Sequence, residues 1–250
     1  MPADSVAGRW WGPFARTRDA VVLHVDLTPH PGRESEALGW LDDAERSRLA
    51  RFTHPRRRRE FVRCRAALRA ALCARLDCAN GQLSFRDTER GKPLALLRGG
   101  PAPASFSVSH SGRHGLLAFA RGGRIGVDVE ERVAWRDLDA LIAAVLTRDE
   151  RAELASSGGG DRIARFFTLW TIKEALLKAL GTGLQLDVAG FEVPPAMRRG
   201  GTTGEFRFPH LPAVAWGIEN LGNEHFAAAL AHERPSEPGA HPGEVAPIED

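Results

Sequence analysis

The chain passes twice through the same order of predicted elements, and this doubling constrains its fold more than any other feature. Each pass begins with a strand of alternating side chains, continues with helices, and ends in several short strands. In the first strand, Val21–Leu27, every second residue is apolar, which is typical of a half-buried strand. In a chain of 250 residues this order predicts two similar α+β halves, although no sequence-level repeat is visible.

Periodicity and end signals place the predicted elements of both halves. Apolar residues at helical spacing and a capping-box pattern at Thr147–Glu150 mark the helices. Helices are predicted at Asp42–Phe52, Arg56–Leu76, Leu138–Leu146, from Thr147 onward, and at Asp161–Gly181. Strands are predicted at Val21–Leu27, Leu83–Arg86, Leu94–Leu97, Ser105–Ser109, Leu116–Ala120, Ile125–Glu130, Gly190–Val193, Glu205–Phe208, Val214–Glu219 and Phe226–Leu230.

A glycine-rich segment, Arg121-Gly-Gly-Arg124, marks the best internal boundary, because it separates the last strand of the first half from the first strand of the second. We therefore predict an N-terminal lobe over residues 1–122 and a C-terminal lobe over residues 123–232. From Glu233 onward the chain is rich in Pro, Gly and Glu, which predicts a disordered tail over residues 233–250.

Charge and cysteine usage narrow the classes of function. The formal net charge is +2, and the positive charge is densest between Arg46 and Arg75, which favours a small anionic ligand or an acidic partner over a general nucleic-acid binder. No apolar run approaches the roughly 20 residues of a membrane span, and the N-terminus lacks a secretory pattern. Three cysteines without metal-binding spacing are typical of a reduced, cytosolic protein. We expect a cytoplasmic protein with no membrane partner.

Lysine is rare in this chain, since Lys92, Lys173 and Lys178 are the three lysines among 34 Lys and Arg residues. Most cationic positions therefore accept arginine. The three exceptions suggest sites that need a compact ammonium whose pKa can shift. Two of them lie in one helical segment, Trp170–Lys178.

Two carboxylates share one face of the predicted strand Ile125–Glu130. Alternation places Asp128 and Glu130 on the face opposite the apolar residues. Mg²⁺ takes oxygen ligands and is often held by one or two carboxylates together with substrate phosphates. A solvated strand face is the simpler interpretation of this segment taken alone.

The helix that carries two of the lysines changes this balance. Glu174 and Lys178 are four residues apart and fall roughly opposite the apolar face of the helix. Such a pair is usually a surface contact worth a few tenths of a kcal/mol. Beside the carboxylates of the strand, however, Glu174 could act as ligand or general base, and Lys178 could neutralise a phosphate or protonate a leaving oxygen. Together the two segments predict a metal-assisted phosphate site.

Two polar turns add weaker signals. The strand Phe106–Gly112 runs into a turn where Ser109, His110 and backbone N–H groups could bind phosphate oxygens. Nucleophilic catalysis by this Ser–His pair is disfavoured, since Gly-x-Ser-x-Gly is absent and sequence neighbours seldom form a triad. The segment Glu89–Pro93 is a turn whose lysine is usually just solvated.

Taken in order, four motifs resemble the 4′-phosphopantetheinyl transferase superfamily, in its surfactin-type, two-lobed monomeric branch. The resemblance extends from about Glu45 to Val193, and the last two motifs are specific at this separation and in this order. The motifs are Arg90-Gly-Lys-Pro93, Ser107-Val-Ser-His-Ser-Gly112, Gly126-Val-Asp-Val-Glu130 and Trp170-Thr-Ile-Lys-Glu-Ala-Leu-Leu-Lys-Ala179.

The resemblance implies both a fold and a reaction. The fold is α+β, with two pseudo-symmetric α+β lobes and coenzyme A in the cleft between them. The reaction moves the 4′-phosphopantetheine arm of coenzyme A onto a serine of an apo acyl or peptidyl carrier protein and releases 3′,5′-ADP. Mg²⁺ is the implied cofactor, and polyketide, nonribosomal-peptide and fatty-acid carriers all remain possible.

The resemblance also implies residue roles. Asp128, Glu130 and Glu174 match the metal carboxylates, with Glu174 also the base for the carrier serine, and Lys178 matches the lysine that assists the departing 3′,5′-ADP. Carrier proteins are implied to dock along Arg124–Leu146. The implied coenzyme A contacts are Arg48, Gly91, Lys92, Pro93, Ser109 and His110.

One position departs from the family, because Glu45 stands where a family cation is expected. Arg46, Arg51 or the Arg56–Arg59 cluster could replace that cation. Lys173 has no firm role and could be only a flank residue.

Two other functions are compatible with the residues. A carboxylate pair, a Glu–Lys pair and an arginine cluster also suit a metal-dependent nuclease or phosphodiesterase. A non-enzymatic protein could dock acidic partners through Arg46–Arg75. The run Arg56–Arg59 could bind nucleic acid, but aromatic residues for base stacking are missing and a charged first helical turn is the commoner explanation. No nucleic-acid partner is therefore expected.

Overall fold

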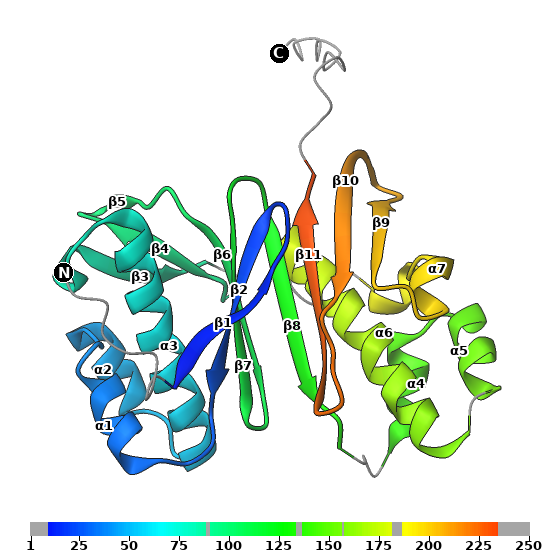
Figure 1. The fold of residues 1–250 in the computed structure, drawn as a ribbon, viewed down its shortest axis with the longest axis horizontal. Helices are drawn as coiled ribbons and strands as arrows, with labels where there is room; N and C mark the ends of the chain where they lie inside the picture. The colour runs from blue at the N-terminus through cyan, green and yellow to red at the C-terminus, as the bar shows by residue number, and fades with distance from the viewer. Residues whose placement is uncertain (1–9, 89–90, 134–136, 157, 182–186, 235–250) are drawn as a thin grey trace, which may run out of the picture.

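Two α+β halves lie side by side in the computed structural model, which describes residues 10–88, 91–133, 137–156, 158–181 and 187–234 (Figure 1). The first half contains β1 (Trp11–Arg16), β2 (Ala20–Asp26), α1 (Pro31–Leu38), α2 (Asp43–Leu49), α3 (Pro55–Leu76), η1 (Asn80–Gln82), β3 (Leu83–Asp87), β4 (Pro93–Leu97), β5 (Gly100–Pro101), β6 (Ser105–Ser111) and β7 (His114–Ala120). The second contains β8 (Ile125–Glu131), α4 (Leu138–Val145), α5 (Arg148–Ala155), α6 (Gly159–Leu180), η3 (Val188–Gly190), α7 (Pro195–Arg198), β9 (Thr203–Phe208), β10 (Leu211–Asn220) and β11 (Phe226–Glu233).

The main sheets of the two halves share the order of three of their four strands, and the fourth strand, β1 or β9, lies at opposite edges of the shared set. In the first sheet the strands are ordered β1-β2-β7-β6, and in the second β8-β11-β10-β9. In the first half, β2 precedes the helices and pairs with the last strand, β7, which also pairs with β6. In the second half, β8 precedes the helices and pairs with the last strand, β11, which also pairs with β10. All these pairs are antiparallel. The predicted fold class, two similar α+β lobes, is confirmed. Strands β3, β4 and β5 form a separate small sheet in the first half.

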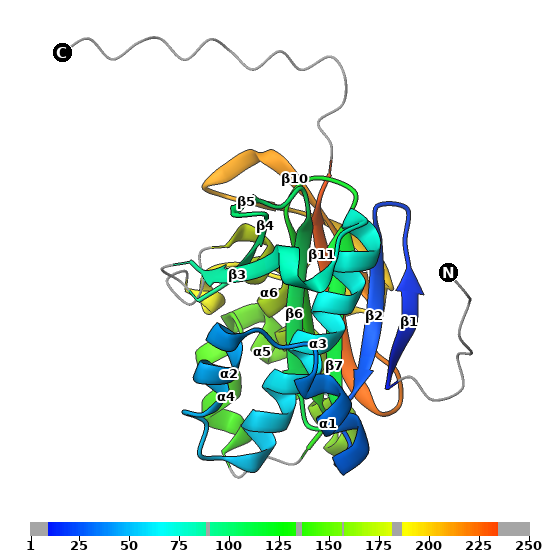
Figure 2. The same ribbon diagram turned by 90° about the vertical axis from the view of Figure 1, so that its left-hand side faces the viewer.

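The two main sheets pack face to face, and one long helix covers the outer face of each. Apolar residues of α3 form one core with the first sheet, and those of α6 form another with the second. A third core lies between the sheets and is built from β2, β7, β8 and β11. Figure 2 shows α3 lying along the outer face of the first sheet. The strand at Val21–Leu27 is therefore buried on both faces, where a half-buried strand was expected; its Val22 and Leu23 belong to different cores.

A ladder of serine hydroxyls joins the edge strands of the two sheets. Strands β6 and β8 are neighbours, but the hydroxyls of β6 take the place of a main-chain ladder. Ser107 Oγ accepts from Val127 N at 3.1 Å, and the same contact recurs two residues on at Ser109 and at Ser111. Alternation puts these serines on one side of β6. The ladder satisfies N–H groups that an open sheet edge leaves unpaired.

Several predicted elements need correction. The predicted strand Gly190–Val193 is wrong, because its first residue ends η3 and the remainder has no regular structure. The long helix predicted from Asp161 begins at Gly159, and Asp42 is the N-cap of α2 with a complete capping box. Strand β1 and helices α1 and α7 were not expected. Most of the tail predicted at residues 233–250 lies outside the described residues. Within the described part of the chain, no helix has the length and apolar character needed to cross a membrane.

Candidate active site

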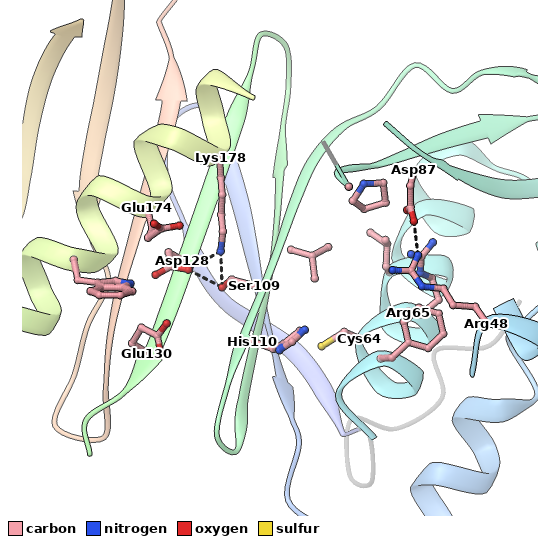
Figure 3. A pocket seen from close by; sticks show the side chains of 16 residues that line it. Arg48, Cys64, Arg65, Asp87, Ser109, His110, Asp128, Glu130, Glu174 and Lys178 are labelled. Carbon is pink, nitrogen blue, oxygen red and sulfur yellow. Dashed lines mark hydrogen bonds and ion pairs between the residues drawn. The ribbon is translucent and has the colours of Figure 1, made fainter. Parts of the chain in front are cut away.

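A cleft of about 460 Å³ lies between the halves and gathers most of the residues singled out in the sequence (Figure 3). One wall comes from α3, the region around Asp87–Pro93 and β6, and the other from β8 and α6. The lining residues are Arg48, Phe61, Cys64, Arg65, Leu68, Asp87, Gly91, Pro93, Val108, Ser109, His110, Asp128, Glu130, Trp170, Glu174 and Lys178. Of the predicted site residues, Lys92 alone does not line this cleft.

The two carboxylates of β8 face α6 because β8 lies directly beneath that helix. A Cβ atom on Gly126 would be 2.1 Å from the Ala175 carbonyl oxygen, so glycine is what allows this close approach. Asp128 and Glu130 follow at alternate positions on the same side and point to the cleft. Asp128 is buried, with 3% of its surface exposed. The interpretation of this strand face as solvated is therefore wrong.

Lys178 bridges the helix to the strand and to the serine ladder. Its Nζ lies 2.6 Å from Asp128 Oδ1 and 2.8 Å from Ser109 Oγ, and Ser109 Oγ donates to the same Asp128 oxygen at 2.8 Å. Figure 3 shows this triangle of contacts. Glu174 also faces the cleft, but it forms no ion pair with Lys178 among the described residues. Lys178 thus pairs with Asp128 of another element, and not with Glu174 in the usual surface contact of two residues four apart on a helix.

Burial and mutual repulsion shift the acidity of the cleft carboxylates. Burial is the main cause that raises the pKa of Glu130 to about 7, and the neighbouring charges of Asp128 and Glu174 add to it. A hydrogen bond from Ser111 Oγ to Glu130 Oε2, at 2.6 Å, and the Lys178 ammonium oppose this rise. Burial likewise raises the pKa of Glu174, with Asp128 contributing. Three carboxylates that line the same partly buried cleft favour the binding of a cation.

The carboxylate oxygens of the cleft are of the chemical type that binds Mg²⁺. Oδ2 of Asp128 is buried and has no hydrogen-bond partner among the described residues, which leaves one hard oxygen available in the cleft. Within the described ranges, however, no three His, Cys, Asp or Glu side chains stand close enough to form a ready-made metal site. Ser109 and Lys178 hold one oxygen of Asp128, and Ser111 holds Glu130. The magnesium site stays a prediction.

The opposite wall of the cleft carries cations. Arg48 and Arg65 reach it from α2 and α3, and Arg48 Nη1 also lies 2.5 Å from Asp87 Oδ2 at the exposed rim. The guanidinium of Arg65 stacks on Phe85 at 4.2 Å from the ring centroid. His110 Nδ1 lies 3.6 Å from Glu60 Oε2, while partial desolvation in the cleft lowers the pKa of His110. Figure 3 shows these cations on the side of α3, facing the carboxylates.

Arg65 is the cleft cation that the sequence did not single out. It lies in the middle of the arginine-rich helix, where nothing in the pattern separates it from its neighbours. Glu45, the acidic departure from the family pattern, is buried and pairs with Arg65 at 3.3 Å and with Arg69 at 2.7 Å. Its contact with Arg65 is too poorly aligned for a hydrogen bond, so Arg65 Nη1 keeps a donor available. Of the proposed replacements, Arg46 donates to two carbonyls, those of Leu38 and Leu41, outside the cleft.

The other two lysines have structural contacts that the sequence did not predict. Lys173, expected to be a flank residue, is fully buried and pairs with Glu150 at 2.7 Å. Its Nζ also donates to the carbonyls of Val145, Val188 and Phe191. Lys92 lines an adjoining cavity, not the main cleft, and donates to two carbonyl oxygens.

Comparison with known proteins assigns the chain to a family. A model described as the 4′-phosphopantetheinyl transferase superfamily matches residues 124–231, and one described as 4′-phosphopantetheinyl transferase, N-terminal, matches residues 27–121. A putative 4′-phosphopantetheinyl transferase of Synechocystis is 36% identical over 200 residues, covering 76% of this chain and 78% of that protein. The chain belongs to the 4′-phosphopantetheinyl transferase superfamily.

Two further relatives support this assignment. The 4′-phosphopantetheinyl transferase HetI of Nostoc is 33% identical over 215 residues, covering 84% of this chain and 86% of its own. The transferase Sfp of Bacillus subtilis is 25% identical over 172 residues, covering 68% and 74%. The predicted family, its surfactin-type branch and the enzyme class are confirmed. None of the comparisons supports the alternative of a nuclease.

Proposed function

We propose that this enzyme transfers the 4′-phosphopantetheine arm of coenzyme A to a serine of an apo acyl or peptidyl carrier protein and releases 3′,5′-ADP. One observation carries the proposal: Asp128, Glu130, Glu174 and Lys178 face Arg48, Arg65 and His110 across a single cleft. A donor with three phosphates needs cations along its length, and a phosphoryl transfer needs charge stabilisation where the bond breaks.

In this scheme the N-terminal wall binds the donor. Arg48 and Arg65 present guanidinium groups that suit phosphate oxygens, and His110 and the hydroxyl of Ser109 lie between them and the carboxylates. Gly91 and Pro93 line the same side and would contact the nucleotide. The Nη1 atom of Arg65 has a donor available, and its guanidinium stacks on Phe85. Arg65 would therefore bind phosphate in place of the family cation that Glu45 replaces.

The C-terminal wall carries the chemistry. The carrier serine loses its proton to the Glu174 carboxylate, directly or through water, and its oxygen bonds to the phosphorus that bears the pantetheine arm. The bond from that phosphorus to the 3′,5′-ADP oxygen breaks, and the Lys178 ammonium neutralises or protonates the leaving oxygen. Asp128, Glu130 and Glu174 would hold Mg²⁺, which when bound neutralises charge on the pyrophosphate.

We further propose that the protein acts as a cytoplasmic monomer and that carriers dock along Arg124–Leu146. Three residues of that segment, 134–136, lie outside the described residues. Of the described residues in this segment, Leu138 and Leu141 pack only partly against the core of the second half, which leaves apolar surface for a carrier helix. Polyketide, nonribosomal-peptide and fatty-acid carriers are all candidates.

The test is the mass of an apo carrier incubated with coenzyme A, Mg²⁺ and the purified enzyme. We expect the carrier to gain one phosphopantetheine group, and we expect Glu174→Gln and Lys178→Met each to lower kcat by about 100-fold or more. Chelation of divalent cations by EDTA should abolish transfer, and added Mg²⁺ should restore it.

A matched control is Asp161→Asn, which removes an exposed carboxylate from the first turn of the same helix, far from the cleft. This variant should transfer at the wild-type rate. Transfer by Glu174→Gln and Lys178→Met at the wild-type rate would contradict the assigned roles. Degradation of DNA or RNA, without any change in carrier mass, would instead favour a nuclease.

A further inference from the structure

We propose that Lys92 is a positioning residue, which fixes the C-terminal end of α6 and so sets where Lys178 lies in the cleft. The inference rests on the proposed transfer reaction. It assigns Lys92 a task different from the coenzyme A contact that family resemblance implies, and that difference can be measured.

The contacts of Lys92 cross from one half of the molecule to the other. The residue precedes β4 in the first half, and its Nζ donates to the Lys178 carbonyl oxygen at 3.1 Å and to the Ile125 carbonyl oxygen at 3.4 Å. Ile125 is the first residue of β8, the strand that carries Asp128. The Lys92 ammonium group is therefore bound to the end of α6, which carries Lys178, and to the start of β8, which carries Asp128.

The end of α6 needs such a donor. The last four carbonyl groups of a helix have no partner within it, and they form the negative end of the helix dipole. The N–H of Gly181, in the left-handed conformation at φ 79°, satisfies the Leu177 carbonyl at 2.9 Å. The next carbonyl, that of Lys178, accepts from Lys92. A cation at this position is favoured by the dipole as well as by the hydrogen bond.

The backbone of Lys92 is hydrogen-bonded to Thr88. Its N–H donates to Thr88 Oγ1 at 3.0 Å, and its carbonyl accepts from Thr88 N at 2.9 Å. Gly91 adopts a φ of 76°, which suits glycine, and its N–H donates to the Thr88 carbonyl. Pro93 follows and restricts the backbone further. The backbone on which the Lys92 side chain stands is therefore held by three hydrogen bonds to Thr88.

The cavity explains why this position holds one of the few lysines. It has a volume of about 220 Å³ and is lined by Gly91, Lys92, Pro93, Phe106, Ser107, Val108, Leu177, Lys178 and Gly181. A compact ammonium can reach two carbonyl oxygens there, whereas a planar guanidinium needs more room and spreads its donors. Burial lowers the pKa of Lys92, with the nearby charge of Arg124 adding to the effect. The carbonyl contacts offset the cost of burying the charge.

The consequence for catalysis follows from the geometry of Lys178. Its side chain must reach Asp128 Oδ1 and Ser109 Oγ at 2.6 and 2.8 Å, and the last helical turn sets its starting point. Loss of the Lys92 contact releases that turn while leaving the cations of the other wall in place. We therefore expect kcat to fall more than the affinity for coenzyme A, because a small misplacement of a reacting group lowers the rate strongly.

The test compares kcat with the affinity for coenzyme A in Lys92→Met, using the full chain and a saturating apo carrier. We expect kcat to fall about tenfold or more and the dissociation constant for coenzyme A, measured by calorimetry, to change less than twofold. Lys92→Arg should also lower kcat, because charge alone does not restore two compact contacts. If Lys92→Met does not fold, Lys92→Gln, which keeps a donor, takes its place in both measurements.

Arg207→Met is the matched control, since Arg207 also donates to a carbonyl, that of Pro212, on a hairpin remote from the cleft. It should leave both kcat and affinity unchanged. A weaker affinity of Lys92→Met for coenzyme A with kcat intact at saturation would overturn the proposal and make Lys92 a ligand contact. Wild-type kcat and affinity together in that variant would overturn it as well.

A second measurement does not depend on turnover. With three lysines in the chain, ¹⁵N-labelled ammonium groups give a simple NMR spectrum. We expect Lys92→Met to shift the Lys178 ammonium signal in the absence of any ligand. An unmoved Lys178 signal would contradict the proposal. Absence of carrier modification by the wild-type enzyme, combined with this shift, would instead refute the proposed reaction and leave the positioning contact intact.

Discussion

The two lobes share a scaffold, but the cleft-facing side chains of their long helices differ. Helices α3 and α6 each span 22 residues and each covers one sheet, with the pairing order β2-β7-β6 matched by β8-β11-β10. Helix α6 presents Trp170, Glu174 and Lys178 to the cleft. When the two helices are aligned by their first residues, Ala70 of α3 corresponds to Glu174 of α6, fifteen residues after the start. Ala74 of α3 corresponds to Lys178 of α6, nineteen residues after the start.

A buried ion pair recurs at the same place in both lobes. Arg69 lies fourteen residues after the start of α3, and Lys173 lies fourteen after the start of α6. Each pairs with the third residue of a short capping-box helix, Glu45 or Glu150, and each also donates to carbonyls of the segment that follows its own helix. The shared pair therefore belongs to the scaffold. The difference is that α6 presents a carboxylate and a lysine to the cleft, whereas α3 presents Arg65.

The largest effect on stability is expected at these pairs. Lys173→Met leaves the buried Glu150 carboxylate without its cation, and Arg69→Met removes the closer of the two arginines that pair with the buried Glu45, so each should lower the free energy of unfolding by about 3–5 kcal/mol. Chemical denaturation of both variants measures this loss. Similar losses in the two lobes would sharpen the comparison.

A double variant provides the control for the C-terminal lobe. Lys173→Met combined with Glu150→Gln removes the unpaired charge, and the amide can still accept from Val193 N. It should recover part of the stability that the single variant loses. A loss of less than about 1 kcal/mol in one single variant would show that the pairs are not equivalent.

A smaller effect is expected at the serine ladder between the lobes. Ser107→Ala leaves the buried Val127 N–H without an acceptor, which should cost about 1–3 kcal/mol. Ser105→Ala, one step earlier on the same strand, is the matched control, because no N–H contact of the ladder reaches that residue among the described contacts. Equal unfolding free energies for the two variants would argue against a role of the ladder in joining the lobes.

The smallest effect concerns pH at a histidine pair between the sheets. His24 Nε2 and His114 Nδ1 lie 3.0 Å apart, and both rings pack on Phe226 of the other lobe. Burial lowers the pKa of both, and His114 lowers that of His24 further. The unfolded chain thus binds more protons, so the stability from this pair is present above about pH 6.5 and is lost as the pH falls below it. The charges that oppose or add to this effect are Asp26, Arg113, Glu131 and His225.

Melting temperatures at pH 7.5 and 5.5 test this expectation. The drop between the two values should be a few degrees smaller in His24→Gln than in the wild type. His210→Gln, which removes a histidine away from this pair, should show the wild-type drop. A drop as large in His24→Gln as in the wild type would mean that the pair does not titrate in this range.

Local patterns in the sequence predict much of this molecule. The alternation in Ile125–Glu130 and the helical spacing around Glu174 place carboxylates and a lysine correctly in one cleft, because each signal depends on near neighbours. The sequence could not show that β8 runs beneath α6, which buries Asp128 and turns Lys178 toward it. That arrangement follows from packing across the chain, with Gly126 as its only local trace.

The missed features have the same origin. Lys173 and Arg65 are buried or cleft-facing only because partners distant in sequence, Glu150 and Phe85, meet them in the fold. The strand expected at Gly190–Val193 does not form because its main-chain groups bind side chains and not a neighbouring strand. The Phe191 carbonyl accepts from Lys173 Nζ, and Val193 N donates to Glu150 Oε1. Propensity predicts a strand there, and tertiary contacts override it.

One measurement tests the central division between a binding lobe and a chemical lobe. Turnover and coenzyme A affinity are determined side by side for Arg65→Met and Lys178→Met. We predict that Arg65→Met weakens coenzyme A binding by about 10–100-fold, as expected for a lost charged hydrogen bond, and keeps kcat near the wild-type value at saturation. Lys178→Met should lower kcat strongly and leave the affinity for coenzyme A near the wild-type value. Equal losses of affinity and of kcat in both variants would contradict the division of tasks between the lobes.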